Sequence, residues 1–71
     1  MARPYYVLMA RSDGLWHGPE FGDYSRSAVE AEKREYHDHY AGKDLAIVTS
    51  PGGTQAEVIE AVAEFKAKQA Q

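Results

Sequence analysis

The sequence contains no cysteine. Disulfide bonds, which stabilise many small secreted domains, are therefore excluded, and so are thiolate metal sites and thiol redox chemistry. Long apolar runs are also missing, because the longest uninterrupted one extends only from Tyr5 to Ala10. Such a run is too short for the apolar core of a signal peptide or for a membrane-spanning helix. We therefore expect a soluble, cytoplasmic protein.

Basic residues are few and scattered. Eight lysines and arginines stand against eleven acidic residues, which gives a net charge of −3, and no stretch of the chain gathers them into a basic stripe. Proteins bind nucleic acids largely by neutralising phosphate charge, so this composition argues against a nucleic-acid partner. The acidic excess is too small and too mixed in sign to predict mimicry of DNA.

The length of 71 residues predicts a single domain that spans residues 1–71. A chain of this size buries only about 60% of the surface that its unfolded form exposes, and its stability is correspondingly small. It has room for one core, and a deep substrate cleft backed by supporting residues does not fit this size.

The first segment with a clear pattern is Pro4–Arg11, which is rich in aromatic and branched residues and predicts a β-strand. Apolar residues occupy both of its faces, which indicates a central strand that is covered on at least one side. The turn Ser12–Gly14 follows, because Asp-Gly suits the positive φ angles of a tight hairpin. Leu15–His17 predicts a short returning strand. We expect Gly18-Pro19 to end it, since proline cannot donate a hydrogen bond to a β-ladder.

A loop and a helix are expected next. Glu20–Tyr24 is assigned to an ordered loop and Ser25–Ala41 to the first helix. Ser27 and Glu30 have the spacing of a capping box, in which the side chain of each residue accepts a hydrogen bond from the backbone N–H of the other. Ser25 is an equally good cap, so the sequence leaves the choice between the two serines open.

The second half of the chain predicts one strand and one helix. Asp44–Thr49 is apolar and branched, and the turn Ser50–Gly53 follows it. Thr54 and Glu57 form another capping box at the start of the last helix. The apolar stripe of this helix is expected to comprise Val58, Ile59, Val62 and Phe65.

These elements predict an α+β fold in the order strand, short strand, helix, strand, helix. A helix between two strong strands favours a right-handed crossover, which would leave those two strands parallel. Both helices would then lie on one face of a sheet of two to three strands, as a small two-layer sandwich similar to half of a ferredoxin-like fold. The other face of the sheet would stay partly open.

No segment carries a recognisable catalytic motif. His37 and His39 would point about 200° apart on a helix, whereas zinc-binding helices use histidines four residues apart. A looser set of Glu35, His39 and His17 keeps metal binding open as an alternative. None of the serines lies in the nucleophile elbow G-x-S-x-G. We therefore predict a protein that is not an enzyme and that uses neither a cofactor nor a metal.

The turn Gly52-Gly53-Thr54 lies between a strand and a helix. Glycines let backbone N–H groups converge, and a helix N-terminus attracts anions. However, no lysine follows the glycines, so the segment is not a P-loop. A turn with a helix cap is the favoured interpretation, and a small bound anion is the alternative.

Aromatic residues are numerous, with five tyrosines, two phenylalanines and one tryptophan. The aliphatic residues already supply most of one apolar layer, so some rings are expected at the surface or in a dimer interface. Trp16 is the leading candidate for an interface anchor, because tryptophan and tyrosine contribute strongly to interface energetics. Alternatively, Trp16 and Phe21 cap the end of the core. Base stacking on tyrosines is not favoured, since the basic surround of RNA-binding domains is missing.

One stretch of sequence resembles a known group of proteins. The segment Phe21–Arg26, with Val29 and Glu32 after it, is similar to a pattern in short accessory proteins of bacteriophages and prophages. The resemblance covers about the first half of the chain and brings no catalytic residues with it. It implies a protein that binds host proteins stoichiometrically, as anti-CRISPR proteins do.

The sequence thus predicts a non-enzymatic protein-binding module, which the resemblance extends to an inhibitor of a host defence complex such as CRISPR–Cas. A homodimer whose additional rings complete the fold is the alternative, and a small anion-binding or metal-binding domain is a further one. The predicted partner-binding surface combines aromatic residues with acidic residues of the first helix: Trp16, Phe21, Tyr24, Glu30, Glu32, Glu35 and Asp38.

Overall fold

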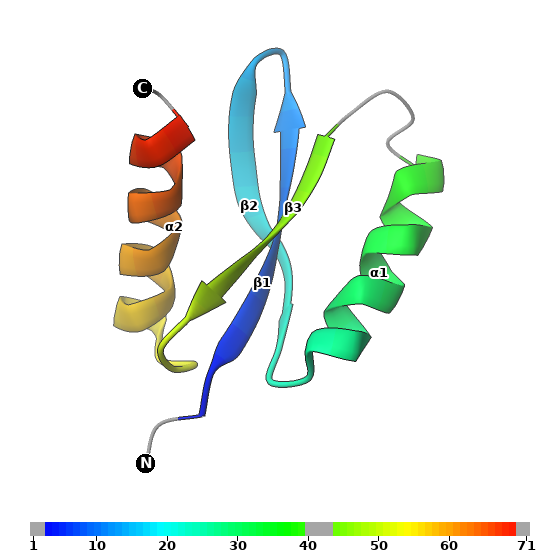
Figure 1. Ribbon diagram of the computed structural model, residues 1–71. Coiled ribbons are helices and arrows are strands. Elements are labelled where there is room, and N and C mark those ends of the chain that lie inside the picture. Colours follow the sequence, from blue (N-terminus) through cyan, green and yellow to red (C-terminus); the bar gives the residue numbers. More distant parts are fainter. Residues whose placement is uncertain (1–2, 40–43, 70–71) are drawn as a thin grey trace.

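The computed structural model describes residues 3–39 and 44–69, with side chains for all of these except residues 37–39. The described residues form three strands and two helices, so the predicted α+β fold is confirmed; Figure 1 shows their arrangement. In chain order they are β1 (Tyr5–Ser12), β2 (Leu15–Asp23), α1 (Arg26–His39), β3 (Asp44–Ser50) and α2 (Gln55–Gln69). None of the helices within the described residues has the length and apolarity needed to cross a bilayer.

The sheet has the strand order β2-β1-β3, and β1 runs antiparallel to both neighbours. The prediction that the first and third strands would be parallel is therefore wrong. The reason is that β2 is a full strand, which returns the chain before α1 begins. Consequently α1 connects β2 with β3, and these two strands run in the same direction on opposite sides of β1.

β2 is much longer than the predicted strand Leu15–His17, because the chain passes the proline in a bulge instead of ending there. Gly18, Pro19 and Glu20 all lie opposite the single residue Met9 of β1, and regular pairing resumes beyond them. The bulge keeps the proline out of the ladder, where its missing N–H would cost a hydrogen bond. Accordingly, the segment predicted as a loop after the proline belongs to the strand, except for its last residue.

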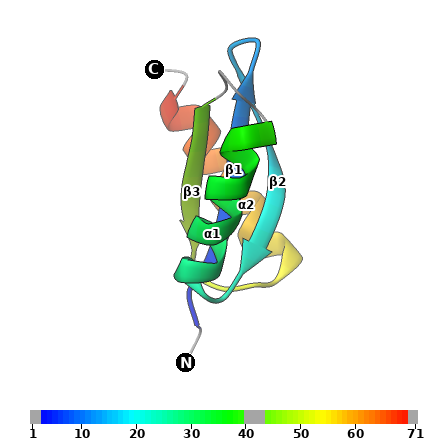
Figure 2. The ribbon, with the colours of Figure 1, turned by 90° about the vertical axis from the view of Figure 1, so that its right-hand side faces the viewer.

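The two helices cover opposite faces of the sheet, so the predicted two-layer arrangement with both helices on one face is wrong. Figure 2 shows α1 in front of the sheet and α2 behind it, which agrees with their positions on either side of the strands in Figure 1. The cause lies in β1, whose residues Val7, Leu8 and Met9 are all fully buried. Successive side chains of a strand point to opposite faces, so both faces of β1 need a cover.

On the α2 face, a core cluster joins the central strand to its neighbours. It comprises Val7, Met9, Val48 and Val62, and partly buried apolar residues surround it, namely Tyr5, Trp16, Val58, Ala61 and Phe65. The predicted apolar stripe of α2 is thus confirmed at three of its positions. Ile59 is the exception, because 60% of its surface is exposed.

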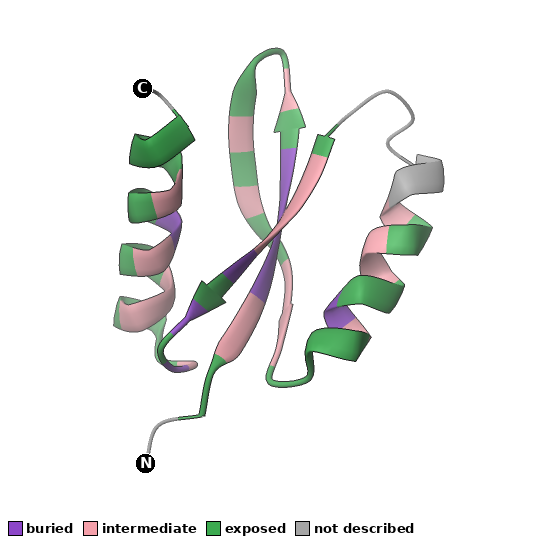
Figure 3. Ribbon diagram, in the orientation of Figure 1, coloured by how far each residue is buried: buried purple, intermediate pink, exposed green. Residues whose placement is uncertain are grey.

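On the α1 face, Leu8 and Ala10 of β1 are buried beneath the helix, which contributes the fully buried Val29. Figure 3 shows this buried position on α1 and the continuous buried stretch along β1. The hydroxyl of Tyr36 donates a hydrogen bond to the carbonyl of Glu20 (3.4 Å), which ties α1 to the last residue of the bulge. The core is therefore divided into two small halves by the sheet.

The start of α1 resolves the choice between the two serines. The amide of Ala28 donates to Oγ of Ser25 (3.3 Å), so Ser25 is the cap. Glu30 does not close a capping box with Ser27 and instead pairs with Arg26 one turn earlier, at 3.5 Å. The helix is described as far as His39, and the predicted end at Ala41 lies outside the described residues.

Candidate functional site

Trp16, the predicted interface anchor, packs toward α2. Its ring meets the ring of Phe65 edge to face, with centroids 5.0 Å apart, and the guanidinium of Arg11 lies 5.6 Å from its centroid. The tryptophan is half-buried and belongs to the rim of the core cluster. In this position it supports the docking of α2, as the alternative interpretation of a core cap expects.

Tyr24 is the most exposed of the described aromatic residues, with 44% of its surface accessible. Its ring packs edge to face on Tyr5 at 4.9 Å, and the guanidinium of Arg3 lies 4.8 Å from its centroid. Phe21 is half-buried in the second part of β2. None of the described rings is fully buried, so the aromatic residues lie at the edge of the core and do not fill it.

The acidic residues of the predicted surface lie on α1, across the sheet from Trp16. Glu30 and Glu35 are exposed and Glu32 is half-buried, whereas the side chain of Asp38 lies outside the described residues. Because α1 and α2 cover opposite faces, the structure separates these carboxylates from the tryptophan. The predicted residues therefore do not form one continuous surface.

The residues considered for metal binding do not come together in the part of the chain that is described. No group of three or more histidine and acidic side chains there could hold an ion. His17 lies on β2 and Glu35 on α1, both exposed, and the side chain of His39 lies outside the described residues.

The turn Gly52-Gly53-Thr54 is occupied by one of the protein's own carboxylates. Oγ1 of Thr54 donates to Oε1 of Glu57 (2.6 Å), and the amide of Glu57 donates back to Oγ1 of Thr54 (3.3 Å). The carboxylate lies so close over the turn that a Cβ added at Gly52 would come within 2.5 Å of it. The predicted capping box is confirmed, and an anion at this turn would meet a negative charge.

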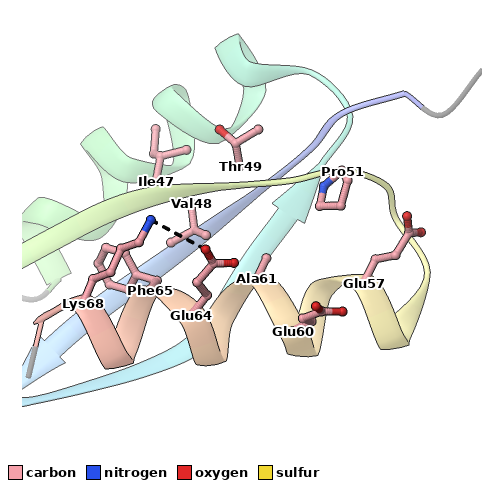
Figure 4. Close-up of a pocket in the computed structure, with 10 residues that line it drawn as sticks. All are labelled: Ile47, Val48, Thr49, Pro51, Glu57, Glu60, Ala61, Glu64, Phe65 and Lys68. Carbon is pink, nitrogen blue, oxygen red and sulfur yellow. Dashed lines mark ion pairs between the residues drawn. The ribbon is translucent and has the colours of Figure 1, made fainter.

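The clearest candidate site is a groove between β3 and α2, which Figure 4 shows in close-up. It has a volume of about 390 Å³. β3 and the residue after it contribute one wall, and α2 contributes the other. The lining residues are Ile47, Val48, Thr49, Pro51, Glu57, Glu60, Ala61, Glu64, Phe65 and Lys68.

The groove has an apolar floor and an acidic rim. Val48, Ala61 and Phe65 belong to the apolar core or pack against it. The rim consists of three glutamates on α2 and a single lysine: Glu57, Glu60, Glu64 and Lys68.

The three glutamates of the rim differ in their partners. Glu57 is held by the cap at Thr54, and Glu64 pairs with Lys68 at 3.7 Å. Glu60 is exposed and forms no ion pair within the described residues. The rim thus has an excess of negative charge, and the carboxylate of Glu60 has no ion-pair partner among the described residues.

The groove runs beside an open edge of the sheet. β3 pairs with β1 without interruption from Tyr5↔Ser50 to Arg11↔Asp44, and no other strand within the described residues pairs with its outer side. An edge strand presents a row of N–H and C=O groups that can pair with another chain. β2, the opposite edge, is interrupted by the Gly18-Pro19 bulge, a feature that blocks such pairing.

A second groove lies between β2 and α2, with a volume of about 680 Å³. Its walls include Pro19 and Phe21 on one side and Val58, Ile59 and Val62 on the other. It is mostly apolar, but it adjoins the strand edge that the bulge interrupts. It therefore offers no regular backbone edge to a partner.

Sequence reasoning missed the groove beside β3, because no motif distinguishes Glu60 and Glu64 from ordinary exposed charges on a helix. The available signal was the spacing of Glu57, Glu60 and Glu64, which puts three acids on one flank of a helix. Comparisons with models of protein families, with curated proteins and with solved structures found no match. The site is therefore interpreted from its own geometry.

Proposed function

We propose that this chain is a non-enzymatic protein-binding module that pairs an extended segment of a partner protein with the open edge of β3. The observation that carries the proposal is the contrast between the two edges of the sheet. β2 carries a bulge with a proline, whereas β3 is regular over its seven residues and adjoins a groove. Proteins usually protect such edges with bulges, prolines or inward charges, and β3 has none of these over Leu45–Ser50.

The physical basis is the addition of a strand to a sheet. Main-chain hydrogen bonds to the edge supply affinity, and pockets that receive every second side chain supply specificity. Alternate residues of an added strand point to the same face of the sheet. On the α2 face, these residues would enter the groove over Val48 and Phe65, which line it.

A partner protein fits this edge better than a second copy of the chain does. Antiparallel pairing of two β3 strands about a two-fold axis would place the two α2 helices on the same face of a joint sheet. The acidic rims of the two grooves, including Glu60 and Glu64, would then face each other. Like charges opposed in this way are destabilising.

The partner that the resemblance to phage accessory proteins implies is a component of a host defence complex, and that identity stays a prediction. The homodimer remains the alternative, and the experiment below distinguishes it. A contact centred on Trp16 is not favoured, for two reasons. The ring of Trp16 packs on Phe65 toward the core, and the sheet separates it from the acidic residues of α1.

The experiment measures amide hydrogen exchange of β3 by NMR in the presence of three peptides. Each peptide has seven residues, the length of β3, with valine alternating with lysine, threonine or glutamate. We expect at least one peptide to slow exchange of the outward-facing β3 amides by about tenfold or more. No protection by any of the three would overturn the proposal. Protection that rises with protein concentration in the absence of peptide would show that a second copy occupies the edge instead.

N-methylated versions of a binding peptide test whether the backbone is what binds. Methyl groups on alternate residues remove the donors from only one edge of an extended peptide. One of the two methylation patterns should therefore abolish protection of β3, and the other should leave it intact. Equal effects of the two patterns would contradict strand pairing.

A further inference from the structure

We infer that the segment bound at β3 carries lysine or arginine at alternate positions and that the glutamates of α2 select it. This inference rests on the proposed pairing at β3 and adds the chemistry of the partner. It is carried by three independent features of the groove, namely its charge, the spacing of its carboxylates and its apolar floor.

The charge of the rim favours a cation. Three glutamates and one lysine line the groove, so it presents negative charge to an added strand. The side chain of Glu64 is 67% exposed, and its pair with Lys68 is a surface pair within one helix. Such pairs contribute little and exchange partners readily. Glu60 has no pair to give up among the described residues.

The spacing of the two carboxylates matches that of side chains on a strand. Glu60 and Glu64 are four residues apart on α2, which corresponds to about 6 Å along a helix. Residues on one face of a strand are about 6.7 Å apart. Figure 4 shows α2 running along the groove, with Pro51 and Glu57 toward one end and Phe65 and Lys68 toward the other. Two successive same-face residues of an added strand can therefore each meet one carboxylate.

The floor of the groove favours long side chains over short polar ones. Lysine and arginine can lay their methylene groups on apolar surface while the charged group reaches a polar rim. Here the methylenes would cover Ala61 and Phe65, and the cations would reach Glu60 and Glu64. Threonine would leave the carboxylates without a partner, and glutamate would add repulsion.

The test compares the affinities of the three alternating peptides by calorimetric titration. We expect the lysine peptide to bind about tenfold more tightly than the threonine peptide, as two surface charge pairs of ordinary strength predict. The glutamate peptide should bind most weakly. In about 0.5 M salt, the preference should fall to about twofold, because exposed charges are screened.

Substitutions separate the rim from general electrostatics. The double variant Glu60→Gln/Glu64→Gln should remove the preference for lysine while β3 protection by the threonine peptide persists. The matched control is Glu30→Gln/Glu35→Gln on α1, which removes the same two negative charges on the opposite face and should keep the preference. Loss of the preference in both variants would indicate long-range charge instead of contact with the rim, and would overturn the inference.

The outcomes for the two proposals are distinguishable. Equal affinities for all three peptides, together with protection of the β3 amides, would overturn the basic-segment inference and leave strand pairing in place. The absence of β3 protection with every peptide would overturn both.

Discussion

The rings of Trp16 and Phe65 pack edge to face, with centroids 5.0 Å apart and planes inclined by 77°. Trp16 comes from the start of β2, close to the hairpin turn, and Phe65 comes from the third turn of α2. Phe65 also lines the groove beside β3. The pair therefore links the packing of the last helix to the shape of the candidate binding site.

Replacement of Trp16 by alanine is expected to lower the free energy of unfolding by about 3 kcal/mol. The loss combines the removal of a large ring from the rim of the core with the loss of the edge-to-face contact. Urea denaturation followed by circular dichroism measures it. Trp16→Phe, which keeps an aromatic ring, should cost about half as much. Unchanged stability of Trp16→Ala would instead mark the tryptophan as a residue free for partner binding.

Gly18 is expected to tolerate substitution far less well than Gly14. Both have positive φ angles, 147° and 79°. However, a Cβ at Gly18 would come within 2.7 Å of Sδ of Met9, whereas at Gly14 it would meet nothing within 4 Å.

We predict that Gly18→Ala destabilises the protein by about 2 to 3 kcal/mol and Gly14→Ala by about 1 kcal/mol. Chemical denaturation of the two variants side by side provides the comparison. Equal losses would contradict the close packing of the bulge against β1.

The sequence predicts the strong elements of this fold well, for identifiable reasons. The apolar runs of β1 and β3 and the capping box at the start of α2 are local signals. The structure contains both strands and the helix. The proline at position 19 misled the prediction, because a proline ends a strand only when it must take part in the ladder. Here a bulge of glycine and proline removes it from the ladder, and pairing resumes afterwards.

The placement of the helices required information that the local pattern held only in part. Apolar residues on both faces of β1 indicated cover on at least one side, and the structure shows that both faces are covered. The candidate groove could not be predicted, because Glu60 and Glu64 lie beside β3 only once α2 occupies a particular face. A helix pattern shows which residues share a flank, but it does not show which strand that flank adjoins.

The cap of α2 offers a further test. Thr54→Ala removes the hydroxyl that accepts from the amide of Glu57 and donates to its carboxylate. We expect a loss of about 1 kcal/mol, which lowers the midpoint of thermal unfolding by about 4 to 8 °C in a domain of this size.

Ser27→Ala is the matched control for the cap, because the hydroxyl of Ser27 bonds only that of the true cap, Ser25, in the described structure. Its midpoint should change by less than about 2 °C. A larger effect at Ser27 than at Thr54 would contradict the assignment of the caps.

Because both faces of the sheet are covered, we expect the stability cost of truncating a side chain to follow its burial and not its size. Val29 of α1 is fully buried, whereas Ile59 of α2 is 60% exposed. Val29→Ala should therefore lower the free energy of unfolding by about 2 kcal/mol, since it opens a cavity beneath α1. Ile59→Ala removes more atoms but should cost less than about 0.5 kcal/mol, because the atoms removed are largely in contact with water and alanine favours the helix. Urea denaturation of the two variants measures the difference. If α1 lay loosely beside the sheet instead of sealing its second face, Val29→Ala would be as mild as Ile59→Ala, and the three-layer arrangement would lose its main energetic support.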